Sequence, residues 1–283
     1  MDIKGLPSGE VLLHNSNPAS LYYSPGGVAR NIAENLGRLN IPTKLLGAVG
    51  TDPMGEQVLT KTAEAGVDVQ FAKREPGYST GVDISFLNTE GDLYLAYCDM
   101  KVVETVDVSY LQAHQRILEK SRYIIADANI PGTSLAWLAE WAFDNHIPLI
   151  IEPSSFQLAT KLHHIQKPVF LITPNEKEWK LINRAQPFNH YQNLLITQGS
   201  KGVSLYNQSE SKSWEAFPTK VLDVIGAGDA LVAGIAYGLF KGLDLEASIP
   251  FGLAAGAMTV QAQETVNPNI SEDLLRKLIR KHL

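Results

Sequence analysis

The sequence is poor in cysteine, in long apolar runs and in basic clusters. Its 283 residues include one cysteine, Cys98, which excludes an intrachain disulfide and a zinc site built from several cysteines. No apolar run reaches the roughly 18 residues that a membrane-spanning helix requires, and the first residues lack the apolar core of a signal peptide. A formal net charge of -6 argues against binding to nucleic acid or to an anionic membrane. We therefore expect a cytoplasmic protein with no nucleic acid and no membrane as partner.

Two common phosphate-binding motifs are also absent. The Walker pattern, G-x-x-x-x-G-K-[ST], does not occur in the chain. The dinucleotide-binding fingerprint would need a third glycine three residues after Gly228, where the chain has Leu231. A phosphate site in this protein must therefore belong to another class.

The most informative stretch is the small-residue turn Gly226, Ala227, Gly228, which is followed by Asp229 and an apolar run over 230–240. The run predicts a buried helix, and the N–H groups and dipole at its amino end favour an anion such as phosphate. Asp229 would repel that phosphate unless a neutral hydroxyl lay between them. We therefore interpret Asp229 as the acceptor of a hydroxyl proton and the three small residues as an anion hole. A capped core helix with a glycine-rich turn is an equally weighted alternative.

The remaining sequence predicts an α/β fold with a mainly parallel sheet. Residues 43–49 are expected to form one buried strand, and from residue 109 short apolar runs alternate with helices. The runs 80–87 and 93–99 predict a hairpin that forms a flap. Residues 1–24 are expected to be irregular, with a short strand near their end. Polar residues follow several predicted strands, where such sheets bind ligands; these residues are Asp127, Asn129, Glu152, Asn175 and Glu178.

Four short motifs then follow one another along the chain. They are Gly26-Gly27 with Asn31, Asn175-x-x-Glu178, Thr197-x-Gly199-x-x-Gly202 and Asp223-x-x-Gly-Ala-Gly-Asp229. In this order and spacing they closely resemble the ribokinase-like (PfkB) family of carbohydrate and nucleoside kinases. Each motif alone is weak, but the four together are specific, and the resemblance covers nearly the whole chain. Within the family, pseudouridine kinases are the most similar group, on the evidence of the stretches 24–36, 98–100, 126–130 and 267–269.

The resemblance implies a ribokinase-like three-layer sandwich. We expect one kinase domain over residues 1–283, with a mainly parallel central sheet and a small β lid that includes residues 80–99. The implied activity is ATP-dependent phosphorylation of a sugar or nucleoside hydroxyl, with pseudouridine as the first candidate substrate. ATP and Mg²⁺ are the implied cofactors, K⁺ is a third candidate, and a homodimer formed through the lid is an option. The alternatives are a ribokinase- or fructokinase-like sugar kinase, or a trimmed relative that binds a nucleoside or nucleotide without phosphorylating it.

The resemblance also implies residue roles. Asp229 would be the general base beside the anion hole of Gly226, Ala227 and Gly228. The substrate-binding positions are Asp2, Gly26, Gly27, Asn31, Asp99 and Asn129. The nucleotide-binding positions are Asn175, Thr197, Gly199, Gly202 and Asn267. The metal positions are Glu178, for water-bound Mg²⁺, and Asp223 and Ile225, for the monovalent cation.

The chain departs from the family pattern in three places. Family members usually open with a strand that ends in Asn-x-Asp, whereas this chain begins Met1-Asp2, so we expect the first strand of the sheet to be missing. The segment 183–193 is too short for the helix that relatives place there, and a parallel crossover takes about a dozen residues. Val224 replaces the usual threonine after Asp223, which removes a hydroxyl group from this loop.

Overall fold

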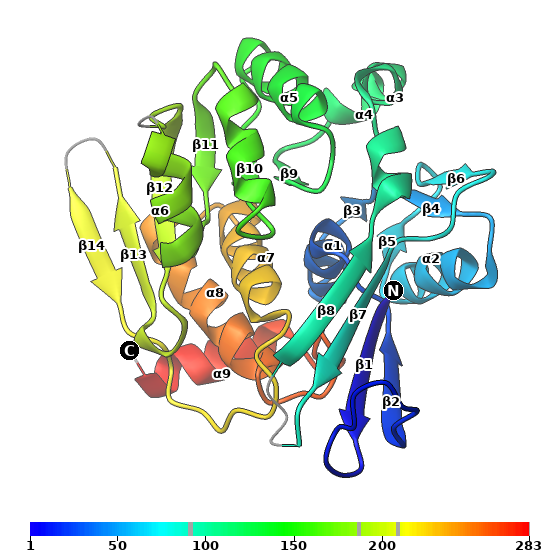
Figure 1. Cartoon of the computed structure of the whole chain (residues 1–283). Coiled ribbons are helices and arrows are strands. Elements are labelled where there is room, and N and C mark those ends of the chain that lie inside the picture. The colour runs from blue at the N-terminus through cyan, green and yellow to red at the C-terminus, as the bar shows by residue number, and fades with distance from the viewer. Residues whose placement is uncertain (90–92, 186–187, 208–209, 283) are drawn as a thin grey trace.

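The computed structural model describes residues 1–89, 93–185, 188–207 and 210–282. Its centre is a sheet with the strand order β14-β13-β12-β11-β10-β9 (Figure 1). Four neighbouring strands are parallel: β9 (Ile124–Asp127), β10 (Leu149–Glu152), β11 (Val169–Ile172) and β12 (Tyr191–Thr197). Two antiparallel strands complete it: β13 (Val203–Tyr206) and β14 (Ser211–Trp214). The apolar runs after residue 109 thus form the predicted, mainly parallel sheet.

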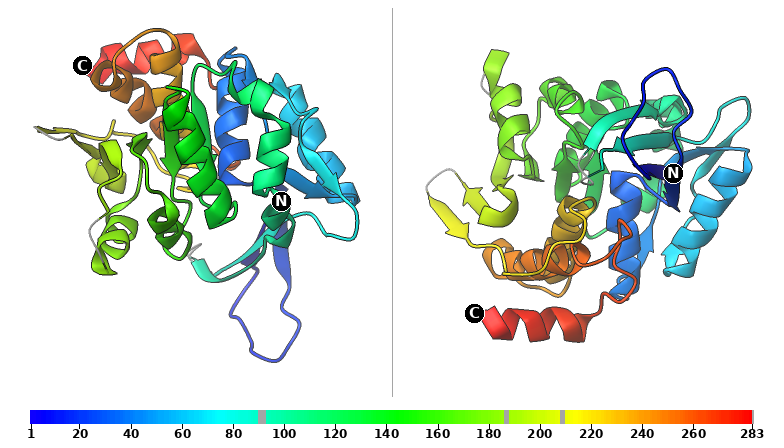
Figure 2. Two further views of the ribbon diagram at one scale, coloured as in Figure 1. Left: turned by 90° about the horizontal axis from the view of Figure 1, so that it is seen from above. Right: turned by 60° about the horizontal axis from the view of Figure 1, so that its bottom comes forward.

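Helices cover both faces of this sheet and make the three layers. Along β10, Ile150 packs into the core on one face, whereas Leu149 and Ile151 pack into the core on the other face, because successive strand residues point in opposite directions. The first core includes residues of α1 (Val28–Arg38), α7 (Ala227–Phe240), α8 (Leu245–Thr259) and α9 (Glu272–His282). The second includes residues of α3 (Val108–Ala113), α4 (Gln115–Leu118), α5 (Gly132–Asp144), η2 (Leu158–His164) and α6 (Glu176–Ala185). Figure 2 shows α9 at the periphery, outside α8.

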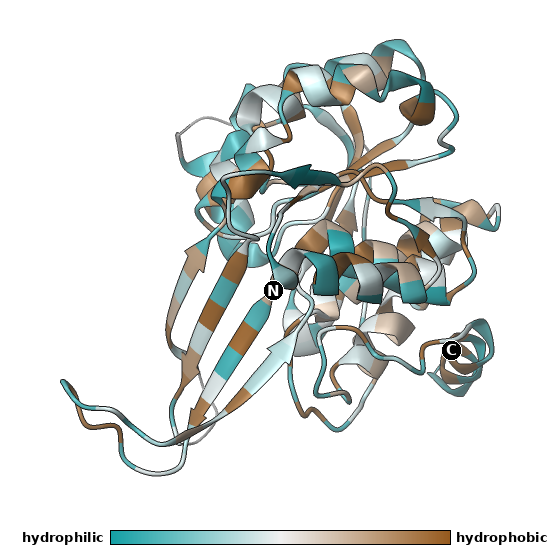
Figure 3. Cartoon of the chain, turned by 90° about the vertical axis from the view of Figure 1, so that its right-hand side faces the viewer, coloured by the Kyte–Doolittle hydropathy of each residue, from teal (hydrophilic) through white to brown (hydrophobic). Residues whose placement is uncertain are grey.

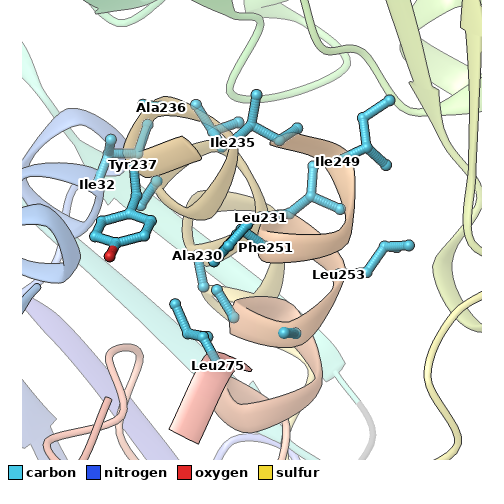
Figure 4. Close-up of a cluster of buried hydrophobic side chains, with 14 of the residues drawn as sticks. Ile32, Ala230, Leu231, Ile235, Ala236, Tyr237, Ile249, Phe251, Leu253 and Leu275 are labelled. Carbon is cyan, nitrogen blue, oxygen red and sulfur yellow. The ribbon is translucent and has the colours of Figure 1, made fainter. Parts of the chain in front are cut away.

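The helices α7 and α8 form a closely packed pair. A Cβ atom on Gly234 would lie 2.4 Å from the carbonyl oxygen of Phe251, and one on Gly252 would lie 2.7 Å from that of Leu231. These glycines let the two backbones approach, and the Tyr237 and Phe251 rings fill the space beside them (Figure 4). The alanine- and glycine-rich composition of the two helices therefore reflects close helix packing.

A second sheet, in the order β2-β1-β7-β8, forms the lid (Figures 1 and 3). The predicted hairpin is present as β7 (Val82–Leu87) and β8 (Leu93–Asp99), although part of its turn lies outside the described residues. The short strand expected near the end of residues 1–24 is present as β2 (Ala19–Ser24), but the expectation that the residues before it are irregular is wrong, because they include β1 (Asp2–Pro7), which pairs with β2. β1 pairs in parallel with β7, so this amino-terminal hairpin adds two strands to the lid sheet.

The single strand predicted over 43–49 is also wrong. The segment forms β3 (Thr43–Lys44) and β4 (Ala48–Gly50), which pair with β5 (Val67–Asp68) and β6 (Lys73–Glu75) in two small sheets. In the part of the chain that the structure describes, no strand joins these small sheets to β9. Residues 43–49 therefore have no adjacent strand long enough to pair with them as one continuous strand. α2 (Pro53–Glu64) and η1 (Lys101–Thr105) complete this half of the molecule.

The short segment 183–193 does not interrupt the sheet. α6 itself connects β11 to β12, which pair in parallel, and the described residues of 183–193 contain no second helix. One crossover helix is therefore sufficient here. None of the helices within the described ranges combines the length and apolarity that would let it cross a bilayer.

Candidate active site

Asp229 lies in the first turn of α7, as predicted. It is 9% exposed, and its carboxylate accepts a hydrogen bond of 2.7 Å from Asn31 Nδ2. Burial raises the pKa of Asp229 to about 7; the bond from Asn31 opposes this rise, and the charges of Asp127 and Asp2 add to it. The carboxylate can thus gain or lose a proton near neutral pH, which suits a general base.

The turn before Asp229 has the backbone that an anion hole requires at two of its three residues. Gly226 has a φ of 80°, and a Cβ atom there would lie 2.0 Å from the carbonyl oxygen of Thr265. An added Cβ at Gly228 would meet nothing within 4 Å, so no other part of the chain crowds the Cα atom of this residue. The Ala227 N–H instead donates a bond of 3.3 Å to the carbonyl of Val224. Because first-turn amides lack partners within a helix, Gly228 is the donor best placed for an anion.

Four of the predicted substrate residues lie together beside this turn. A Cβ atom on Gly26 would lie 1.9 Å from Asp2 Oδ1, which places the Asp2 carboxylate directly against the glycine. Gly27, with a φ of 101°, is the N-cap of α1, and Asn31 follows on the same helix. The predicted site thus joins the start of β1, the start of α1 and the start of α7.

Asn129 also lies at this end of the sheet, where its neighbour Asp127 organises the end of β9. The Asp127 carboxylate accepts hydrogen bonds of 2.8 Å from the backbone N–H groups of Ala29 and Asn129. The Asn129 side chain donates a bond of 3.1 Å to Ser154 Oγ. Asp127 therefore ties α1 to the sheet, and Asn129 faces the loop after β10.

Asp99 is the predicted substrate residue that the structure does not bring to this cluster. Its side chain, at the end of β8, is 59% exposed and lies 3.7 Å from Lys101 Nζ. Its Oδ1 atom accepts a bond of 3.1 Å from the Lys101 N–H. These contacts are local to the lid, so the structure shows Asp99 as a turn residue at the lid's edge.

The Asn175-x-x-Glu178 motif forms a capping box at the start of α6. Asn175 Oδ1 accepts a bond of 3.0 Å from the Glu178 N–H, and Glu178 Oε2 accepts one of 2.8 Å from the Asn175 N–H. Asn175 also forms a bridge with Thr197 at the end of β12. The motif therefore has a structural role that the spacing alone predicts, and it fixes both residues beside the predicted nucleotide loop.

The predicted nucleotide loop follows β12 directly. Gly199 and Gly202 have φ values of 58° and 99° around η3 (Gly199–Lys201), and a Cβ atom on Gly202 would lie 2.0 Å from the carbonyl oxygen of Trp214. Asn267 is occupied by local contacts, since its Nδ2 donates a bond of 2.7 Å to the Met258 carbonyl and its Oδ1 accepts one of 2.9 Å from the Asn269 N–H. Its side chain thus holds the loop after α8.

In the predicted monovalent-cation loop, a lysine side chain already pairs with the acidic residue. The Asp223 carboxylate forms an ion pair with Lys4 of the lid strand β1, and it accepts a bond of 2.9 Å from the Ile225 N–H. Because the Lys4 ammonium already compensates this charge, the observed contacts do not fit K⁺ at the Asp223 carboxylate.

The donor set near Glu178 does fit Mg²⁺ held through water and phosphate. Burial raises the pKa of Glu178, and it raises that of Glu152 further, with added repulsion from the charges of Asp229, Glu178 and Asp127. A divalent cation would relieve such repulsion. Over the described ranges, no three acidic, histidine or cysteine side chains lie close enough to hold a metal alone.

Arg30 and Lys4 received no site role from the sequence, and Glu152 was named only among the polar residues after predicted strands. Arg30 Nε donates a bond of 3.2 Å to Asn31 Oδ1 and forms a buried ion pair with Glu34, so the Asn31 amide is turned with Nδ2 toward Asp229. The four-residue spacing of Arg30 and Glu34 was the only signal for this. Lys4 and Glu152 meet the site through tertiary packing.

Comparison with known proteins identifies the family. The profile described as pfkB family carbohydrate kinase matches residues 13–272. A pseudouridine kinase of Escherichia coli is 30% identical over 286 residues, which covers 96% of this chain and 91% of that protein. An uncharacterised sugar kinase of the same organism is 28% identical, covering 99% of this chain and 81% of that protein.

Solved structures show the same architecture. A carbohydrate kinase from Agrobacterium tumefaciens superposes with a TM-score of 0.82 at 25% identity, covering 99% of this chain and 94% of that one. A ribokinase from Thermotoga maritima has a TM-score of 0.81 at 18% identity, with 99% and 96% covered. The fold is therefore ribokinase-like, and the chain belongs to the pfkB family of carbohydrate kinases, the ATP-dependent phosphotransferases that act on sugars and nucleosides.

Proposed function

We propose that this kinase transfers the γ-phosphoryl group of ATP to the 5′-hydroxyl of pseudouridine. The similarity to a pseudouridine kinase over 96% of the chain carries the choice of substrate. The contact of Asn31 with Asp229 at 2.7 Å, at the amino end of α7, carries the choice of base.

In the proposed reaction, Asp229 accepts the proton of the substrate hydroxyl while the new oxygen–phosphorus bond forms. The bond between the γ-phosphorus and the bridging oxygen breaks, and ADP leaves with the electron pair. Asn31 orients the Asp229 carboxylate, and Arg30 orients Asn31. The Gly228 amide and the dipole of α7 stabilise charge on the transferred group.

Other residues hold the two reactants. Asp2, Gly26 and Gly27 bind the sugar hydroxyls, because the Asp2 carboxylate can accept hydrogen bonds from them and backbone N–H groups can donate to their oxygens. Thr197, Gly199 and Gly202 bind the nucleotide. Mg²⁺, held near Glu178 through water, would supply positive charge to the phosphate oxygens. Our proposal gives K⁺ no role, since Lys4 already pairs with Asp223.

The substrate assignment is tested by measuring ADP release with pseudouridine, uridine, ribose, adenosine and fructose. We expect pseudouridine to give the highest kcat/KM by at least about tenfold, which corresponds to one or two extra contacts in the transition state. A higher kcat/KM with ribose or fructose would overturn the substrate and leave the kinase assignment intact. The similarity to a sugar kinase keeps this second candidate open.

A further inference from the structure

One cavity joins the proposed sugar site to the loop after β9. It has a volume of about 970 Å³ and divides β9 from β4, two strands that belong to different sheets. Its lining includes residues 124–127 and Ala48, from these strands, and also Gly26, Gly27 and Asn129. A ligand bound by its sugar at the start of α1 can therefore extend through the cavity toward Asn129.

The Asp127 carboxylate keeps Asn129 close to the start of α1. It accepts a bond of 2.8 Å from the Ala29 N–H, two residues after Gly27, and another of 2.8 Å from the Asn129 N–H. One carboxylate group thus bridges the two backbones. Because the base of a nucleoside is bonded directly to its sugar, we expect the base of a bound nucleoside to lie beside the loop that contains Asn129.

The side chain of Asn129 is not needed to hold its own loop. The backbone is fixed by Asp127, which accepts from the Asn129 N–H, and by Lys161 Nζ, which donates a bond of 3.0 Å to the Asn129 carbonyl. Over the described ranges, the side chain has one hydrogen-bond partner, because its Nδ2 donates a bond of 3.1 Å to Ser154 Oγ. Asn267 differs, since local backbone groups occupy both ends of its amide.

The Asn129 amide keeps a free donor and a free acceptor side by side. A carboxamide has two N–H donors and two lone pairs on its oxygen. The contact with Ser154 uses one of these four positions, so an N–H and a lone pair remain whichever end of the amide meets the hydroxyl. Such an amide can form two parallel hydrogen bonds with a ring edge that has an N–H next to a carbonyl. A uracil ring has this edge, which we call the lactam edge, and a free sugar does not.

Ser154 has a backbone conformation that serine rarely adopts. Its φ is 67°, in the left-handed region. Two contacts hold it there, since its N–H donates to the Glu152 carboxylate and its hydroxyl meets the Asn129 amide. Backbone strain of this kind persists only where the surroundings fix it, and it is concentrated at ligand sites. The strained turn sets the hydroxyl against Asn129 and so holds the plane of the amide.

We propose that the Asn129 amide reads the lactam edge of a nucleobase and that Ser154 positions this amide. The inference rests on the proposed function and adds the group that selects a nucleoside over a free sugar. Asn129 is then a specificity-determining residue, and Ser154, which acts through Asn129, is a positioning residue. A site with such polar groups disfavours a substrate that leaves them unpaired.

The kinetic test compares pseudouridine with ribose. Asn129→Leu keeps the approximate size of the side chain and removes its polar atoms, so the ratio of kcat/KM for pseudouridine to that for ribose should fall by about 30–100-fold. The matched control is Asn145→Leu, at the carboxyl end of α5, where the amide bonds only its own helix. We expect the control to leave the ratio unchanged. An unchanged ratio in Asn129→Leu would overturn the proposal.

The positioning role is tested by combining variants. Ser154→Ala should lower the same ratio by about three- to tenfold, and it should lower it no further in the Asn129→Leu background, because the amide that it positions is absent there. Ser155→Ala is the control, since that hydroxyl accepts a bond from the Leu158 N–H at the start of η2. Equal effects of Ser154→Ala in the two backgrounds would overturn its role as a positioning residue.

Calorimetry without ATP separates this inference from the proposed activity. The probe is 1,3-dimethylpseudouridine, whose ring has no N–H group. The unchanged protein should bind it at least about tenfold more weakly than pseudouridine, whereas Asn129→Leu should bind the two within about threefold. If Asn129→Leu keeps the full preference for pseudouridine, the inference fails while the proposed activity stands on its turnover. If the preference is lost in Asn129→Leu but the unchanged protein does not phosphorylate pseudouridine, the inference holds and the proposed activity fails.

Discussion

At β10 the sheet is paired on both edges and packed on both faces, whereas at β9 one edge faces a cavity. Ile150 of β10 is fully buried, and its register partner Ile125 of β9 is half-buried and lines this cavity. The α7–α8 pair, with the proposed base at its amino end, belongs to the first region. The lid and the small sheets around β4 belong to the second. The comparison teaches that the proposed base, Asp229, is held by the fully packed region, while Asp2, a proposed substrate residue, belongs to the lid in the divided region.

The largest expected effect is a loss of turnover from one substitution in the packed region. Asp229→Asn removes the proton acceptor and keeps the shape, so we expect kcat to fall by about 10²–10⁴-fold with ATP binding retained. Isothermal calorimetry with ATP and steady-state turnover measure the two properties. Asp223→Asn is the matched control in the same loop, since its carboxylate pairs with Lys4, and we expect a much smaller loss of kcat. Similar losses in the two variants would contradict the role given to Asp229.

The second prediction compares the two regions directly by truncating register partners. Ile150→Ala leaves a cavity in a closed core and should lower the free energy of unfolding by about 2–5 kcal/mol. Ile125→Ala removes a side chain that already borders open space, and its cost should be about 1 kcal/mol. Urea unfolding of both variants measures the difference. Equal losses of stability would show that the cavity beside β9 is closed in solution.

The third prediction concerns pH. Because the pKa of Asp229 is raised to about 7, kcat/KM should rise about tenfold per pH unit below that value and level off above it. Asp2→Asn should move this limb to lower pH, since the Asp2 charge helps to raise the pKa of Asp229. Asp99→Asn should leave the limb in place, because Asp99 is exposed and away from the cluster.

The raised pKa of Asp229 also makes the free energy of unfolding depend on pH. The folded state keeps the Asp229 proton between the ordinary value of 3.8 and about 7, whereas the unfolded chain releases it. The contribution of this group to the free energy of unfolding therefore falls as pH rises through that window. In Asp229→Asn this decline should be absent from the pH dependence of urea unfolding. An unchanged decline would assign it to other groups, such as Glu152.

The smallest expected effect tests the contact between the two regions. Lys4→Met breaks the ion pair that joins β1 of the lid to the loop before α7, and Tm should fall by roughly 2–4 °C, as for a loss of about 1 kcal/mol. K⁺ should restore part of this loss in the variant and have no such effect on the unchanged protein. Lys101→Met removes an exposed ion pair of the lid and should leave Tm unchanged. Equal stabilisation of both proteins by K⁺ would contradict the view that Lys4 occupies this position.

Local sequence determined much of the packed region. The apolar run after Asp229 predicted a buried helix because its residues are apolar on every side. The runs from residue 109 predicted parallel strands, since a strand covered on both faces is continuously apolar. Asn175 and Glu178 were correctly placed just after a strand end, and their spacing of three residues is that of the capping box which the structure shows. The resemblance based on four motifs identified the family.

The tertiary structure alone decided the rest. Residues 1–24 form half of the lid because β1 pairs with β7, about 80 positions along the chain. Local sequence patterns do not predict strand pairing over such a distance. Other features also depend on contacts that local sequence does not show. Lys4 pairs with Asp223, and Arg30 orients Asn31. Asp99 pairs with Lys101 at the edge of the lid, away from the residues around Asp229. Residues 43–49 form two short strands because strand formation depends on the adjacent strand as well as on the residues themselves. Short-range patterns thus determined the helices, the parallel strands and the loop chemistry, whereas contacts between distant residues decided which groups face the substrate and where the sheet stays open.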